Sequence, residues 1–188
     1  MRQDNTTIKN LKIILAENEA VLSHMEGRSV ALLEDRIKSV KRIFFAGAGR
    51  TGLALKMAAM RFMHLGYNVH IMGETTTPAI LEGDMLIVGS GSGTTTTLVS
   101  AVEKAKRQKA TVVAITTAKD SPIARISDHI LIIKAAVKTD FGESASEQYA
   151  GSLFEQSVLI MLDAVFMKLW KDSGLTKEDL WTKHANLE

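Results

Sequence analysis

The spacing of hydrophobic residues changes along the chain, and each spacing predicts either a helix or a strand. Near the N-terminus, residues 6–24 and 29–39 carry apolar side chains at spacings of three and four, which is typical of helices with one buried face. Further on, short apolar runs alternate with stretches of helical spacing. The runs predict strands at 42–46, 68–72, 85–89, 111–116 and 129–133, and the stretches predict helices at 51–65 and 94–108.

This alternation predicts an α/β fold. Short strands that are apolar throughout are buried on both faces, as in a parallel sheet that helices cover on each side. Five such strands fit a doubly wound, flavodoxin-like sheet with the order 2-1-3-4-5, in which strands one and three lie side by side. The loops after those two strands would then open into one crevice, where sheets of this kind bind ligands.

The length of the chain bounds the number of domains. At 188 residues, it can bury one proper core but is too short for a cofactor domain and a separate substrate domain. We therefore expect a single domain over residues 1–188. Its parts are N-terminal helices, an α/β core and C-terminal helices, at 1–40, 41–134 and 147–188.

The last third of the chain has a different pattern. A polar loop at 140–146 precedes a helix from 147 to about 170 that is apolar nearly all round. Such a helix is expected to be buried, either under the sheet or in an oligomer interface. Thr176 and Asp179 have the spacing of a capping box, which predicts a short final helix before the C-terminal tail.

Composition excludes several classes of function. The chain has 23 basic and 21 acidic residues and a formal charge of +2, so neither a nucleic-acid footprint nor a membrane-surface helix is indicated. Without cysteine it can have no disulfide, thiolate chemistry or cysteine zinc site. The histidines lack the spacing of metal ligands, so no metal is expected. The polar N-terminus and the lack of a spanning segment predict a cytoplasmic protein.

The loop after the third predicted strand has the composition of an anion site. Ser90, Gly91, Ser92 and Gly93 are followed by four threonines, 94–97, at the start of a helix. Glycines allow close approach of the backbone, and the N–H groups of a first helical turn point toward an anion. Capping needs a single hydroxyl, whereas residues 90–97 offer six, so the loop predicts a phosphate-type ligand.

The loop after the first strand allows two interpretations. The sequence GAGRTG at 47–52 matches the dinucleotide fingerprint, with Glu74 where an acid would bind the ribose. The alternative uses the same loop in the crevice of the hydroxyl-rich one, with Gly49 for close approach, Thr51 as a donor and Arg50 as a charged contact. We prefer this second interpretation because the chain leaves no room for a substrate domain. Arg50 could equally form a surface salt bridge.

Two further residues are candidates for chemistry. Glu155 interrupts the apolar pattern of the long helix, which is typical either of a proton-transferring base or of a buried ion pair. His184 follows Trp181 in the C-terminal tail, where a histidine is usually solvated. Residue spacing does not decide between these possibilities.

Four motifs, taken in order, resemble those of the sugar isomerase (SIS) domain family: GAGRTG, VGSGSGTTTT, FGESASEQYAGSLFEQ and WTKHANLE. The resemblance covers nearly the whole chain. It implies a catalytic Glu155, which matches the enediol base of related isomerases, and an active-site His184 that reaches a neighbouring subunit. Thr51 stands where the family usually has serine and keeps the hydroxyl. The residues it implies for phosphate binding are Ser90, Ser92, Gly93 and Thr95, with Thr97 nearby.

The resemblance also implies an activity. Members with this ending interconvert D-arabino-hex-3-ulose 6-phosphate and D-fructose 6-phosphate through a cis-enediol, without metal or cofactor, in the ribulose monophosphate pathway that fixes formaldehyde. It further implies a homotetramer that works together with 3-hexulose-6-phosphate synthase. Two alternatives stay open: an isomerase of another phosphosugar, such as a heptose or arabinose phosphate, and a non-catalytic SIS module that senses sugar phosphates.

Overall fold

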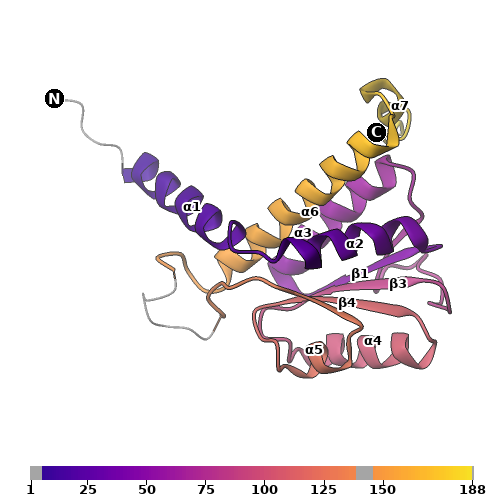
Figure 1. The fold of residues 1–188 in the computed structure, drawn as a ribbon, viewed down its shortest axis with the longest axis horizontal. Helices are drawn as coiled ribbons and strands as arrows, with labels where there is room; N and C mark the ends of the chain where they lie inside the picture. The colour runs from indigo at the N-terminus through magenta and orange to yellow at the C-terminus, as the bar shows by residue number, and fades with distance from the viewer. Residues whose placement is uncertain (1–5, 139–145, 188) are drawn as a thin grey trace.

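The computed structural model describes residues 6–138 and 146–187 and is built around one sheet of five parallel strands. The order β2-β1-β3-β4-β5 confirms the predicted doubly wound arrangement, with the first and third strands adjacent (Figure 1). The strands lie within about a residue of their predicted ends. They are β1 (Ile43–Gly47), β2 (Val69–Ile71), β3 (Met85–Gly89), β4 (Thr111–Thr116) and β5 (His129–Ile132).

The register of β1 and β3 sets the position of the crevice. The two strands pair from Ile43 beside Met85 to Gly47 beside Gly89, so they end at the same level. Every residue of β3 is buried, as expected for a central strand covered on both faces. The loops that follow β1 and β3 therefore leave the sheet side by side.

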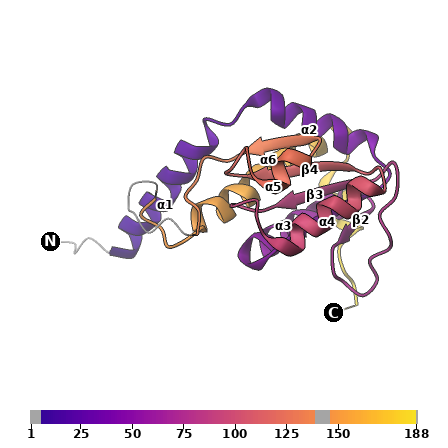
Figure 2. The ribbon, with the colours of Figure 1, turned by 90° about the horizontal axis from the view of Figure 1, so that it is seen from below.

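Helices cover both faces of the sheet. On one face lie α2 (Gly27–Ser39), α3 (Gly49–His64) and α6 (Ser152–Ser173), which share an apolar core with residues of all five strands. On the other face lie α4 (Thr96–Arg107) and α5 (Pro122–Ile126), seen in front of the sheet in Figure 2. The sequence pattern does not predict α5, because a helix of about one turn is too short to show a period. The Ser121 side chain caps this helix, and Pro122 is its first residue.

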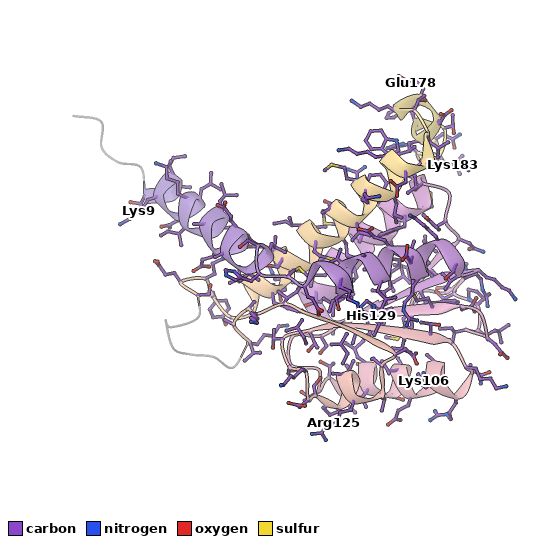
Figure 3. The ribbon with its side chains drawn as sticks, viewed as in Figure 1. Lys9, Lys106, Arg125, His129, Glu178 and Lys183 are labelled. Atoms are coloured by element: carbon purple, nitrogen blue, oxygen red, sulfur yellow. The ribbon has the colours of Figure 1, made fainter. Side chains whose placement is uncertain are left out.

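The N-terminal helix α1 (Thr6–Leu22) projects from the body of the molecule, with Lys9 on its outer part (Figures 1 and 3). Its stripe of Ile8, Leu11 and Leu15 is exposed in the single chain, at 48–59% of each side chain's surface. Only Asn18 of this helix is buried, where it contacts α6. Among the described helices, none is long and apolar enough to cross a membrane.

The start of α6 differs from the prediction, which placed it at residue 147. The helix begins at Ser152, because Ala150 has a positive φ of 53° that no α-helix contains. Ile160 and Met167 are exposed, so α6 is buried on one face rather than all round. The capping box of Thr176 and Asp179 is present and opens α7 (Lys177–Trp181). Of the predicted polar loop, residues 140–145 lie outside the described part of the chain.

Candidate active site

A cavity of about 290 Å³ lies at the carboxyl ends of β1 and β3, where the fold predicts ligand binding. Four parts of the chain form its walls: the start of α3, the loop after β3, the segment after β5 and the start of α6. Its lining includes Ala48, Thr51, Ser90, Gly91, Ser92, Thr94, Thr95, Lys138, Gly151, Phe154 and Glu155.

Glu155 lies in the first turn of α6 with its carboxylate in this cavity, and only 5% of the residue's surface is exposed. Arg50 Nε donates a hydrogen bond to its Oε2 at 2.5 Å, and Lys138 Nζ lies 3.8 Å from its Oε1. The carboxylate is thus both ion-paired and open to a ligand. Two cations of the same chain therefore lie against its two oxygens.

Nothing in the sequence distinguishes Lys138 from the other lysines of the chain. Only the path of the chain after β5 brings it to Glu155.

The loop after β3 lines the cavity with four residues that carry hydroxyls, Ser90, Ser92, Thr94 and Thr95. Ser90 Oγ accepts a hydrogen bond from the N–H of Gly93 at 3.1 Å and lies 3.3 Å from Thr95 Oγ1. Thr95 is the N-cap of α4, yet its hydroxyl caps no N–H group of the helix. Among the described residues, the N–H groups of Thr96 and Thr97 have no protein acceptor, which leaves them free to bind an anion.

Gly93 is required by the shape of this loop. Its φ of +63° is strained for other residues, and a Cβ atom here would lie 2.0 Å from Ser121 Oγ. Gly49, at φ +56°, similarly turns the chain from β1 into α3. It does not line the cavity itself, and neither does Gly93; both set the path of the backbone that does.

The glycines of GAGRTG serve packing between β1 and α3. A Cβ atom on Gly52 would lie 2.7 Å from the carbonyl oxygen of Gly47, and Thr51 next to it is buried against the cavity. Glu74, which a dinucleotide site would need at the ribose, instead pairs with Lys56 at 3.0 Å and does not line the cavity. The geometry thus favours the second interpretation of this loop.

Two predicted residues lie elsewhere. The side chain of Thr97 lines a separate hollow of about 250 Å³ between β1, β3 and α4. His184 lies at the far end of α3, where its ring stacks on His64 with centroids 3.9 Å apart and on Trp181 at 4.6 Å. At a rise of ~1.5 Å per residue, α3 holds His64 about 20 Å from Arg50, so this chain does not bring His184 to its own cavity.

In residues 6–138 and 146–187, no group of three or more His, Asp or Glu side chains is placed to hold a metal ion. That the protein works without a metal or cofactor stays a prediction, which an activity assay without added metal or nucleotide can test.

Residues 36–163 match the SIS domain family, and the chain belongs to that family. Among curated relatives, it is 50% identical to the 3-hexulose-6-phosphate isomerase of Mycobacterium gastri, over 95% of this chain and 90% of that one. It is 43% identical to the enzyme of the same name from Bacillus subtilis, over 93% and 95% of the two chains.

A solved structure agrees with these relatives. The crystal structure of a protein from Methanococcus jannaschii, for which a molecular function of 3-hexulose-6-phosphate isomerase was inferred, superimposes with a TM-score of 0.83. The two sequences are 30% identical, and the alignment covers 96% of this chain and 99% of that one.

Proposed function

We propose that this protein is an isomerase that interconverts D-arabino-hex-3-ulose 6-phosphate and D-fructose 6-phosphate. The observation that carries the proposal is the position of Glu155. Its buried carboxylate faces a cavity whose opposite wall is a hydroxyl-rich loop at a helix N-terminus. One cavity therefore offers a base and a phosphate site, as the curated relatives' reaction requires.

The reaction moves one proton between neighbouring carbons. Glu155 removes the proton from C2 of the 3-keto sugar, the electrons of the C–H bond form the C2=C3 bond, and the π electrons of the C3 carbonyl move to O3, which gives a cis-enediolate. The same carboxylate, now protonated, returns the proton to C3, while the hydroxyl proton passes from O2 to O3 and the carbonyl forms at C2. Because the two carbons are adjacent on one face of a cis-enediol, a single carboxylate serves both.

The cations beside Glu155 have a second role in this proposal. Arg50 and Lys138 reach the carboxylate from exposed positions, and Lys138 lines the cavity in which the substrate's O2 and O3 would lie. Negative charge develops on these oxygens in the enediolate, and a fixed cation stabilises it. We assign binding of the substrate's phosphate to Ser90, Ser92, Thr95 and the N–H groups at the start of α4. Gly93 gives the loop that carries these residues its backbone shape.

The test is a coupled assay on purified protein with no added metal or nucleotide. Fructose 6-phosphate is supplied together with a hexulose phosphate synthase, and release of formaldehyde is followed. Glu155→Gln is expected to lower kcat by at least about a hundredfold, because the amide cannot accept the proton. The matched control Glu103→Gln changes an exposed carboxylate on α4 and should leave activity intact.

The outcomes separate the alternatives. Full activity of Glu155→Gln would contradict the assigned base. No activity of the wild type, with fructose 6-phosphate still raising the melting temperature, would favour a sugar-phosphate sensor or an isomerase of another phosphosugar.

We also propose that the chain forms a homo-oligomer, a tetramer by resemblance, through the outer face of α3. Leu53, Met57 and Met60 are 55–62% exposed there, beside Ile160 of α6, which is far more apolar surface than a monomer normally leaves in water. In a two-fold contact between antiparallel copies of α3, the His64 end of one copy lies at the Arg50 end of the other. That geometry would carry His184 toward the partner's cavity.

Mixing two inactive variants tests this assignment. Glu155→Gln and His184→Ala subunits, refolded together, should regain activity in about a quarter of their sites, because random pairing restores one intact site in each mixed dimer. No recovery from two separately inactive variants would contradict a shared site. The exposed Met57 offers a parallel test: Met57→Glu should elute as a smaller species in size-exclusion chromatography.

The setting of the enzyme follows from its substrate. Phosphate esters are charged and do not cross a bilayer unaided, so we place the enzyme in the cytoplasm, where sugar phosphates are made. An aldol reaction that joins formaldehyde to ribulose 5-phosphate yields such a 3-keto hexose phosphate, which is the basis for proposing coupling to 3-hexulose-6-phosphate synthase. We take residues 1–188 as one domain, since α2 and α6 both contribute to the main core.

A further inference from the structure

A hydrogen-bonded network joins α1 to the segment that leads into α6, away from the residues assigned to substrate. Its centre is Glu17. Its Oε2 accepts hydrogen bonds from Ser146 Oγ at 2.7 Å and Gln148 Nε2 at 2.8 Å, and its Oε1 accepts one from the N–H of Glu147 at 2.7 Å. Three donors from three successive positions thus converge on one carboxylate.

The network continues into α6 itself. Gln156 Nε2 donates to Gln148 Oε1 at 2.9 Å, and Asn18 Nδ2 donates to Gln156 Oε1 at 2.7 Å. Ser157 Oγ donates to Asn18 Oδ1 at 3.1 Å. Gln156 and Ser157 directly follow Glu155 along α6, so these hydrogen bonds tie the first turns of the helix to α1.

The charge of Glu17 suits this role. Partial burial raises the pKa of its carboxyl, but the hydrogen bonds from Gln148, Ser146 and Glu147 outweigh burial, and the pKa lies below its ordinary value of 4.5. The group is therefore an anion at neutral pH, and hydrogen bonds to an anion are stronger than those between neutral groups.

The segment that Glu17 holds ends in a strained turn next to the base. Ala150 has a φ of 53°, a conformation that is strained outside glycine and persists only where the surroundings impose it. Gly151 follows and forms part of the cavity wall, where an added Cβ would lie 3.8 Å from Glu155 Oε1 and 3.2 Å from Lys138 Cγ. The carbonyl of Gly151 accepts the N–H of Glu155 at 3.1 Å.

We propose that Glu17 is a positioning residue for the isomerisation: by holding residues 146–148, it imposes the turn at Ala150–Gly151 that aims the Glu155 carboxylate at the substrate. This inference rests on the proposed function, since it assumes that Glu155 is the base. Glu17 touches neither the cavity nor the phosphate loop. Its loss should therefore affect proton transfer rather than substrate binding.

Glu17→Gln tests the inference in the coupled assay. The amide places an NH₂ group against donors, so at least one of the three hydrogen bonds is lost. We expect kcat to fall about tenfold or more, with KM for fructose 6-phosphate within about threefold of the wild type, because small displacements of a catalytic group cost this much. Glu17→Asp keeps the charge and should recover part of kcat. Amide hydrogen exchange should become faster at residues 148–155 in Glu17→Gln.

Two controls separate positioning from general stability. Glu19→Gln removes an exposed carboxylate from the same helix and should leave kcat unchanged. Leu169→Ala removes a buried side chain from the other end of α6, away from residues 146–148, and so lowers stability without touching the network. The inference is overturned if Glu17→Gln retains kcat within about twofold, or if Leu169→Ala lowers kcat as much at the same loss of melting temperature.

The same assay tests the proposed function separately. Activity that survives Glu155→Gln overturns the assignment of the base. Activity lost with Glu155→Gln but kept with Glu17→Gln overturns the role of Glu17 alone.

Discussion

The packed pair α3 and α6 carries a different chemistry at each end. At the cavity end, Arg50 and Glu155 meet in a hydrogen-bonded ion pair that opens into a cavity. At the histidine end, His64 and His184 stack face to face, with Trp181 on the outer side. Figure 3 shows Glu178 and Lys183 near this second end, far from the sheet.

The two ends differ in how fully a single chain pairs their polar groups. At the cavity end, Arg50 and Lys138 of the same chain lie against the two carboxylate oxygens of Glu155, so a single chain forms this ion-paired group. At the histidine end, the Nδ1 atoms of His64 and His184 are buried without a hydrogen-bond partner, beside exposed Met57 and Met60. Unpartnered polar atoms next to apolar surface are typical of a region that another subunit completes.

Arg50→Gln tests the cavity end and should have the largest effect. In the proposed mechanism, the ion pair orients Glu155 and supplies positive charge for the enediolate, so kcat should fall by about a hundredfold with little change in KM. Steady-state kinetics measures both values. Arg107→Gln, an exposed arginine on α4, is the matched control. A rise in KM with kcat unchanged would mean that Arg50 binds the phosphate rather than assisting proton transfer.

Gly93→Ala should have the next largest effect, on stability. The new Cβ meets the Ser121 side chain at 2.0–2.4 Å, and the residue keeps a strained φ, so we expect a loss of about 2–4 kcal/mol in the free energy of unfolding. Urea denaturation measures this loss. Gly66→Ala has a similar positive φ but open space around it, and it should cost only about 1 kcal/mol. Equal losses in the two variants would refute the steric argument.

The sequence predicted the sheet and its order because local patterns determine them. Buried parallel strands are apolar throughout, and alternation with helices leaves few topologies. The hydroxyl-rich loop and Glu155 were also predictable, since each breaks the pattern of its surroundings: six hydroxyls exceed capping needs, and a carboxylate interrupts an apolar helix.

The contacts between distant segments could not be predicted in the same way. Nothing local marks Lys138 as the second cation at Glu155, because the position of its chain segment decides that contact. The positive φ of Ala150 delays the start of α6, although alanine favours helices, because tertiary contacts override propensity. The same holds for Thr97, the second residue of α4, whose side chain lines the separate hollow rather than the cavity.

The smallest effect we expect is a pH dependence confined to the histidine end. Burial, followed by the charges of His184 and Arg61, holds the pKa of His64 below its ordinary value of 6.5. Between its folded and unfolded pKa values, the unfolded chain binds more protons, so stability contributed by neutral His64 is present above about pH 6.5 and is lost as pH falls. Among the described residues, no histidine of the same chain lines the cavity, so a loss that depends on His64 should not arise there.

Fluorescence of Trp181, whose ring stacks on His184, measures this change locally. As pH falls from 7.5 to 5.5, the melting temperature should drop by a few degrees, and the Trp181 signal should change before global unfolding. His64→Phe keeps an aromatic ring in the stack but cannot titrate, so it should reduce both changes. Some dependence will remain, because burial also lowers the pKa of His129. If His64→Phe retains the full pH response of the Trp181 signal, the histidine end does not titrate, and the difference between the two ends lies in packing alone.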